Sequence, residues 1–178
     1  MLKRSQARER MLSQIRSAFK ACQHPGWDEA LYGNAAWQDE MSQSEGELEN
    51  LSYELRPTRP WNETDPISLR GSGIVLLSVC PQAIGYFLAA HLWHAVSVPE
   101  QLDDGVDSLL LWLEGDFPDE PRRALQLASL SHPQRAAIRA FIDYVSTYGL
   151  GNLYISNDIQ QLRTRWAAAS RQGPDSQV

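Results

Sequence analysis

The feature that most constrains this fold is a helical period of apolar residues that recurs along the chain. It is clearest between His132-Pro133, where a helix can open, and Gly149, where it can close. The apolar positions in between are Ala137, Ile138, Phe141, Ile142, Val145 and Tyr148. This spacing places the side chains on one face of an α-helix. A helix is therefore predicted from His132 to Tyr148.

A second long segment, from Pro81 to about Ser97, is apolar on most sides. It follows the apolar run Ile74 to Val79, and Pro81 suits the first position of a helix. Its broad apolar face comprises Ala83, Ile84, Phe87, Leu88, His91, Leu92, Ala95 and Val96. A helix that is apolar nearly all round is buried. We predict that this helix lies at the centre of the domain.

Shorter patterns predict further helices around these two. They comprise an amphipathic helix with a basic outer face over the first twenty or so residues, a short helix across the forties and early fifties between loops, a buried helix over 107–113, a helix starting at 119–121 and a last helix capped by Asn157. The expected fold is mainly α: a single-domain bundle of about six to seven helices over residues 1–171. It has a loop-rich acidic segment, little or no β-structure and a frayed tail over 172–178.

Charge is segregated along the chain, although the net charge is only −6. Six of the 16 basic residues fall in the first 20 positions, whereas the acidic segment (residues 28–65) holds ten acids against Arg56 and Arg59. A general nucleic-acid binder would instead concentrate basic and aromatic residues on one face. We expect no nucleic-acid partner.

Large aromatic side chains lie within and beside the acidic segment. Aromatic residues supply much of the binding energy at protein interfaces, and a field of one sign speeds encounter with an oppositely charged partner. The candidate partner-binding residues are Trp27, Trp37, Glu45, Glu47, Tyr53 and Trp61. The alternative is a solvated acidic face whose tryptophans pack under a long loop.

Cysteine usage and hydropathy indicate the cytoplasm. Cys22 and Cys80 are far apart and form no CxxC motif, which favours two reduced core thiols. The basic first twenty residues do not resemble a signal peptide, and the longest unbroken apolar runs, Tyr86 to Ala90 and Leu109 to Leu113, are far too short to span a bilayer.

One residue pattern could carry metal chemistry. His91 and His94 lie three apart on the predicted central helix, a spacing that can provide two ligands, and Asp107 could supply a third. The chain has no HExxH, no CxxC and no GxSxG motif, and no phosphate-binding loop follows Gly71-Ser72-Gly73. We therefore favour the interpretation that His91 and His94 are packed core side chains, and we predict no catalytic residue, metal or cofactor.

A core motif resembles that of an uncharacterised bacterial domain-of-unknown-function family. Leu76-Leu77, Pro81, Ala83 and the run Tyr86 to Leu92 resemble a pattern of the form LxxLxPxAxxYYLPAYL, and Pro133 to Phe141 resembles a downstream PxQxAAIxAF helix without matching its spacing between Pro and Gln. Cys80 stands where the family usually has a threonine. The resemblance implies a helical architecture and supplies no activity.

Three functions remain open from the sequence. The favoured one is a non-enzymatic protein-binding domain, such as an immunity or antidote protein that neutralises a basic toxin through the acidic, aromatic-rich segment. The alternative is a small metal-dependent hydrolase that uses His91, His94 and an aspartate between Asp103 and Asp107. The third is a structural subunit that assembles through its first helix.

Overall fold

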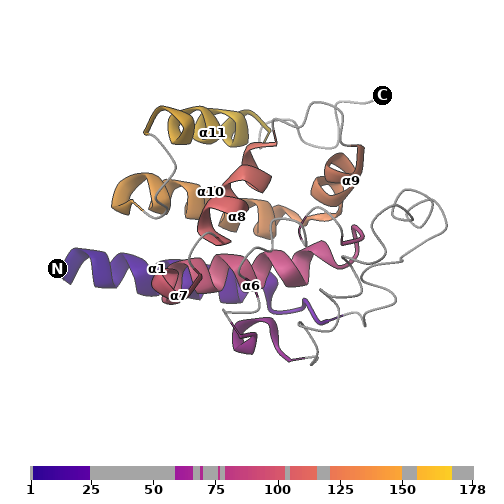
Figure 1. The fold of residues 1–178 in the computed structure, drawn as a ribbon, viewed down its shortest axis with the longest axis horizontal. Helices are drawn as coiled ribbons and strands as arrows, with labels where there is room; N and C mark the ends of the chain where they lie inside the picture. Colours follow the sequence, from indigo (N-terminus) through magenta and orange to yellow (C-terminus); the bar gives the residue numbers. More distant parts are fainter. Residues whose placement is uncertain are drawn as a thin grey trace.

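The computed structural model describes residues 2–24, 59–65, 69, 76, 79–102, 105–115, 121–149 and 156–169 (Figure 1). Within these ranges the chain forms seven α-helices and one 3₁₀ helix, and no strand. The mainly helical class is therefore confirmed. The predicted helix across the forties and early fifties, the loop before it and the tail lie outside the described residues. The predicted loop after that helix is described only over 59–65, where it holds the 3₁₀ helix.

The helices follow one another along the chain with their ends close to the expected positions. They are α1 (Leu2–Phe19), η1 (Trp61–Glu63), α6 (Ile84–Ser97), α7 (Pro99–Leu102), α8 (Gly105–Glu114), α9 (Pro121–Ser129), α10 (His132–Tyr148) and α11 (Ser156–Ala169). Among them, none is both long and apolar enough to cross a membrane.

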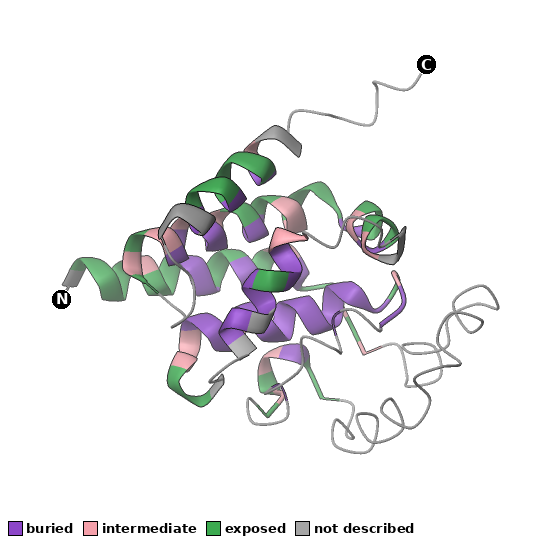
Figure 2. Cartoon of the chain, turned by 45° about the horizontal axis from the view of Figure 1, so that its top comes forward, coloured by how far each residue is buried: buried purple, intermediate pink, exposed green. Residues whose placement is uncertain are grey.

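Helix α6 lies at the centre, as predicted. Twelve of its 14 residues are buried, and it packs against α1, α8, α7, α10 and η1. Figure 2 shows it buried along almost its whole length. Leu88 and Leu92 are fully buried, and each such side chain contributes about 1.5–3 kcal/mol of hydrophobic stabilisation.

The predicted start of this helix at Pro81 is wrong. Residues 81–83 form a turn, in which the Ala83 amide donates to the Cys80 carbonyl at 3.0 Å, and Ala83 is the N-cap. Two side chains of α9 hold the chain entering this turn. Ser129 Oγ donates to the Pro81 carbonyl at 2.7 Å, and Gln126 Nε2 donates to the Leu76 and Val79 carbonyls at 2.8 and 2.7 Å. Contacts across the fold therefore set where α6 begins.

Helix α1 docks on the core through one face, as expected. Met11, Leu12, Ile15 and Phe19 are buried, and the helix packs against both α6 and α10. Its basic side chains, Lys3, Arg4, Arg8, Arg10 and Arg16, are all exposed, as is Lys20 directly after its last residue. Because its apolar face is already buried within the chain, that face is not available for assembly of a structural subunit.

Helix α10 has the predicted bounds. Ser131 is its N-cap, and the Ser131 amide donates to Gln134 Oε1 at 2.7 Å. Gly149 ends it with a φ of 64° and donates its amide to the Val145 carbonyl at 2.8 Å. Glycine suits this left-handed conformation, so the local sequence defines both ends of the helix.

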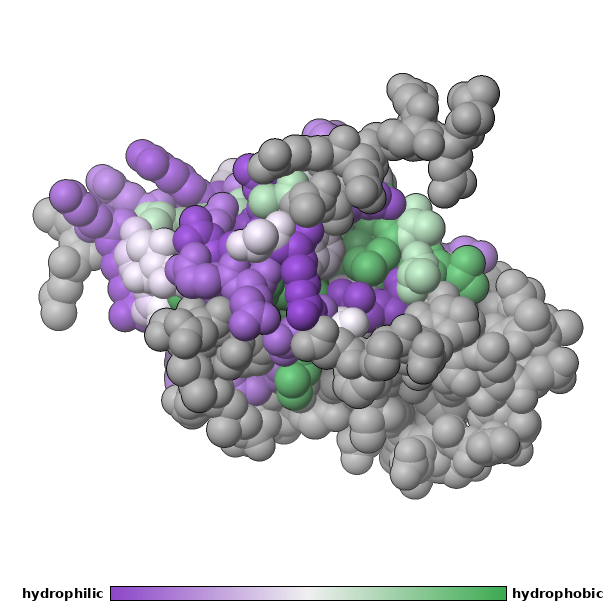
Figure 3. Space-filling model, turned by 90° about the horizontal axis from the view of Figure 1, so that it is seen from above, coloured by the Kyte–Doolittle hydropathy of each residue, from purple (hydrophilic) through white to green (hydrophobic). Residues whose placement is uncertain are grey.

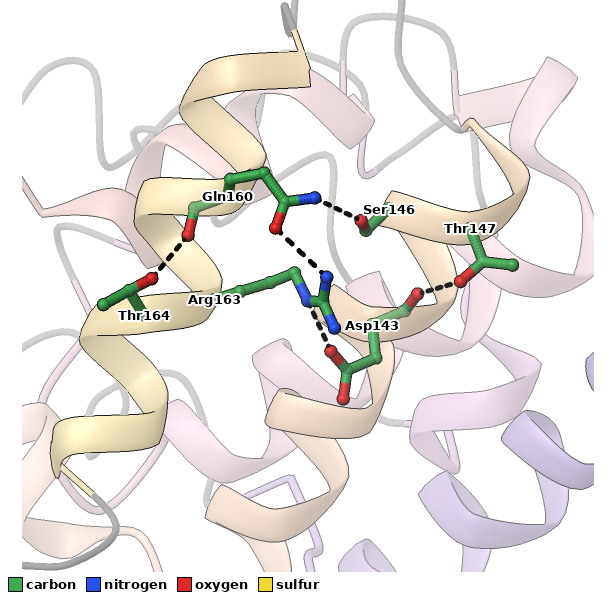
Figure 4. Close-up of polar contacts among 6 residues, drawn as sticks. All are labelled: Asp143, Ser146, Thr147, Gln160, Arg163 and Thr164. Atoms are coloured by element: carbon green, nitrogen blue, oxygen red, sulfur yellow. Dashed lines mark hydrogen bonds and ion pairs between the residues drawn. The ribbon is translucent and has the colours of Figure 1, made fainter.

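The last helix, α11, packs on α10. Ile159, Leu162 and Trp166, which recur at helical spacing, are buried. Figure 4 shows the polar edge of this contact, where Arg163 pairs with Asp143 of α10 at 2.7 Å. The helix begins at Ser156, so the prediction that Asn157 caps it is wrong; Asn157 lies in its first turn.

The C-terminal end of α8 is capped from two other helices. Arg123 of α9 donates to the Trp112 and Leu113 carbonyls at 2.8 and 2.7 Å, and Trp166 Nε1 of α11 donates to Leu113 at 3.1 Å. These bonds satisfy carbonyls that a helix end leaves without intrahelical partners. They also join α8, α9 and α11.

Candidate functional site

His91 and His94 both lie on the inner side of α6. His91 is completely buried, and its Nδ1 lies 2.7 Å from the Phe87 carbonyl, one turn earlier. A neutral ring that is protonated at Nδ1 donates to this carbonyl. Burial lowers the pKa of His91 to about 4; the bond to Phe87 opposes this shift and the neighbouring His94 adds to it.

His94 is 6% exposed and faces the segment after η1. Burial lowers the pKa of His94, whereas an interaction with the Thr64 backbone and the negative charge of Asp65 raise it by less. Among the described residues, neither ring nitrogen has a partner at full hydrogen-bond geometry, so the Thr64 interaction is a weak one. Both histidines are therefore held as neutral, packed side chains.

The three weak metal candidates do not form a metal centre. Asp107 is buried on α8, but across the described ranges no three histidine, cysteine, aspartate or glutamate side chains are grouped so that they could hold an ion. Asp103 and Asp104, which the hydrolase alternative also considered, lie outside those ranges. The described residues thus do not supply the three-ligand site that the alternative needs.

The two thiols occupy different environments and neither is in a disulfide. Cys80 is buried, as predicted. Cys22 is partly buried, and Gln134 Nε2 donates to its sulfur at 3.1 Å. Burial raises the pKa of Cys22, although the bond from Gln134 opposes this, so the thiol stays protonated near neutral pH.

Of the predicted partner-binding residues, the structure describes only Trp61. Its side chain is 5% exposed, its Nε1 donates to the Phe19 carbonyl at 3.1 Å, and its ring meets Trp93 edge-on at 5.7 Å. Trp61 therefore fastens η1 to the end of α1 and is not an exposed contact residue. Trp27, Trp37, Glu45, Glu47 and Tyr53 lie outside the described residues.

A cleft lies where η1 meets the end of α1. We call it the α1–η1 cleft; its described lining is Arg16, Lys20, Cys22, Gln23, His24, Arg59, Pro60, Trp61 and Asn62, and its volume is about 530 Å³. The sequence interpretation missed this grouping. Arg16 and Lys20 belong to the basic face of the first helix, but no sequence pattern brings Arg59 beside them.

The α1–η1 cleft also marks where the undescribed part of the acidic segment joins the bundle. The structure describes the chain up to His24 and again from Arg59, and both residues line the cleft. The His24 ring packs edge-on against Tyr86 and Phe87 of α6, and the Tyr86 hydroxyl donates to the Arg59 carbonyl at 2.7 Å. Both junctions are therefore fixed on α6.

Comparisons of the chain with protein-family models, with curated proteins and with solved structures find no match.

Proposed function

We propose that this chain is a non-enzymatic protein-binding domain whose acidic segment docks onto a basic partner, in the manner of an immunity protein that neutralises a basic toxin. The bundle serves as the scaffold and the acidic segment serves as the recognition element. A single observation carries the proposal: His24 and Arg59, the described residues on either side of 25–58, which hold most of the acids and aromatics of the acidic segment, lie at one place on the bundle, beside the α1–η1 cleft.

Three features of this arrangement support the proposal. A binding segment anchored at both ends on a rigid helix loses less entropy on docking than a free tail. Its ten acids and its tryptophans combine long-range attraction with large contact area. The two histidines of α6 are buried as packed core residues, which favours a function at the surface of the protein.

The bacterial origin and the cytoplasmic location are parts of the same proposal. The first is supported by the resemblance of the Pro81 to Leu92 motif to a bacterial family. The second is supported by two cysteines that form no disulfide.

The test is co-expression of the full chain with the product of the adjacent gene, followed by size-exclusion chromatography and calorimetry of the purified pair. We expect a stable 1:1 complex whose association rate falls as salt is raised, because the attraction between opposite charges is screened. The double variant E45Q/E47Q should lower the association rate several-fold, and Trp37→Ala should raise the dissociation rate.

The matched control is E9Q/E100Q, which removes two exposed acids outside the acidic segment. It should change neither rate by more than about twofold. Failure to form a complex refutes the proposal for that partner, and equal losses in the two double variants refute the role of the acidic segment.

A further inference from the structure

The α1–η1 cleft has the size and the charge of a small-ligand site. Its volume of about 530 Å³ lies within the range of roughly 300–1,000 Å³ that small-molecule pockets occupy. Three cationic side chains, Arg16, Lys20 and Arg59, line it, and its described lining contains no acid. The described lining of the cleft is therefore a concentrated group of positive charges in a chain whose net charge is −6.

The cationic side chains are available to a ligand. All three are exposed, and within the described residues none of them forms an ion pair. Arg16 is held in place by a cation–π contact, with its guanidinium carbon 4.9 Å from the centre of the Trp93 ring. This contact orients the guanidinium without neutralising its charge.

The walls of the cleft are fixed before any ligand arrives. Trp61 Nε1 donates to the Phe19 carbonyl at 3.1 Å, which joins η1 to the last residue of α1. The bond from the Tyr86 hydroxyl to Arg59 joins the other side of η1 to α6, and the Glu63 amide closes the turn on the Pro60 carbonyl at 2.8 Å. A preorganised site loses little conformational entropy on binding.

We propose that the α1–η1 cleft binds a small soluble ligand through a phosphate or diphosphate group. Three positive charges match the two to three negative charges of such a group better than the single charge of a carboxylate. Guanidinium groups donate in a fork that fits phosphoryl oxygens, and a lysine adds a point charge. The amides of Gln23 and Asn62 line the same space and provide neutral hydrogen bonds to the rest of the ligand.

This proposal differs from the proposed partner interface in the charge of what is bound, since the cleft recognises an anion whereas the acidic segment recognises a basic protein. The first measurement is calorimetric titration of the full chain with inorganic pyrophosphate at low salt. We expect a Kd below about 1 mM and 1:1 stoichiometry. Lys20→Gln and Arg59→Gln should each raise that Kd about tenfold, since each removes a charged donor.

The matched control is Arg4→Gln. It also removes one exposed positive charge. Arg4 lies 15 residues before Phe19, the last residue of α1, which places it about 22 Å along the helix from the end that meets η1. The control should change the Kd less than twofold. Circular dichroism melts of the three variants should be alike, because all three side chains are exposed.

Three further probes define the ligand class. If ADP binds at least as tightly as pyrophosphate, the ligand is a nucleotide. If ADP binds more weakly, the cleft recognises the phosphoryl group alone. Either outcome supports the proposal provided that Lys20→Gln weakens the binding. Citrate binding as tightly as pyrophosphate would overturn the phosphoryl assignment. A single-stranded oligonucleotide that binds more tightly and is weakened equally by Arg4→Gln would show a diffuse basic face instead. Absence of pyrophosphate binding at millimolar concentration would also overturn the proposal.

Discussion

Acid should destabilise this protein through His91. The folded chain binds a proton on this ring only near and below pH 4, because the ring is completely buried, whereas the unfolded chain binds it near pH 6.5. Between these two values unfolding takes up a proton, so the free energy of unfolding falls as the pH falls through this window. Above about pH 6.5 both states hold a neutral ring and the effect disappears.

The structure gives the size of this effect. With a folded pKa of about 4 and an unfolded pKa of about 6.5, linkage gives a loss of about 2–3 kcal/mol between pH 7.5 and pH 4.5, and a limit of about 3 kcal/mol at lower pH. His94, whose pKa is also lowered by burial, should add to the loss in the same direction. A change of this size is a large part of the stability of an ordinary domain.

Urea unfolding followed by circular dichroism across this pH range measures the effect. The variant His91→Leu keeps an apolar side chain in the core and removes the titrating ring, so its stability should fall by about 2–3 kcal/mol less than that of the wild type between pH 7.5 and 4.5. The control is His132→Gln, because His132 is exposed. It should leave the pH dependence unchanged.

The reasoning is refuted if His91→Leu loses as much stability in acid as the wild type does. In that case the burial of His91 would not govern the acid transition. A pKa of His91 near 6.5 by NMR titration of the folded protein would refute it independently.

Four further substitutions test the packing by thermal unfolding. Gly115→Ala should lower the free energy of unfolding by about 2–3 kcal/mol, because Gly115 has a φ of 62° and a Cβ there would meet the Arg123 guanidinium. Gly149→Ala should lower it by only about 1 kcal/mol, because Gly149 has a similar φ of 64° but open space around it. Equal losses in the two variants would contradict the clash with Arg123. Gln126→Leu should cost about 2–4 kcal/mol because it leaves two buried carbonyls without donors, and a neutral effect would contradict their burial. Arg163→Gln should cost less than about 1 kcal/mol, since its ion pair is exposed; a larger loss would show that the pair anchors α11.

Local sequence determined the kind and the ends of several elements. The apolar spacing of 132–148 and Gly149 are enough to define α10, because helical period and a left-handed end residue are properties of neighbouring residues. The same holds for the inward face of α1 and the burial of α6. These features require no knowledge of which helix lies beside which.

Only the tertiary structure decided where particular side chains act. Trp61 has the sequence context of a surface aromatic in an acidic segment, yet it is buried because the end of α1 offers a carbonyl and Trp93 a ring. Pro81 lies in a turn because α9 holds the carbonyls of Val79 and of Pro81 itself. Likewise, Arg59 lies 39 positions after Lys20 and lines the same cleft only because η1 packs on α1 and α6. Contacts between residues so far apart in the chain depend on how the helices pack, which local spacing does not encode.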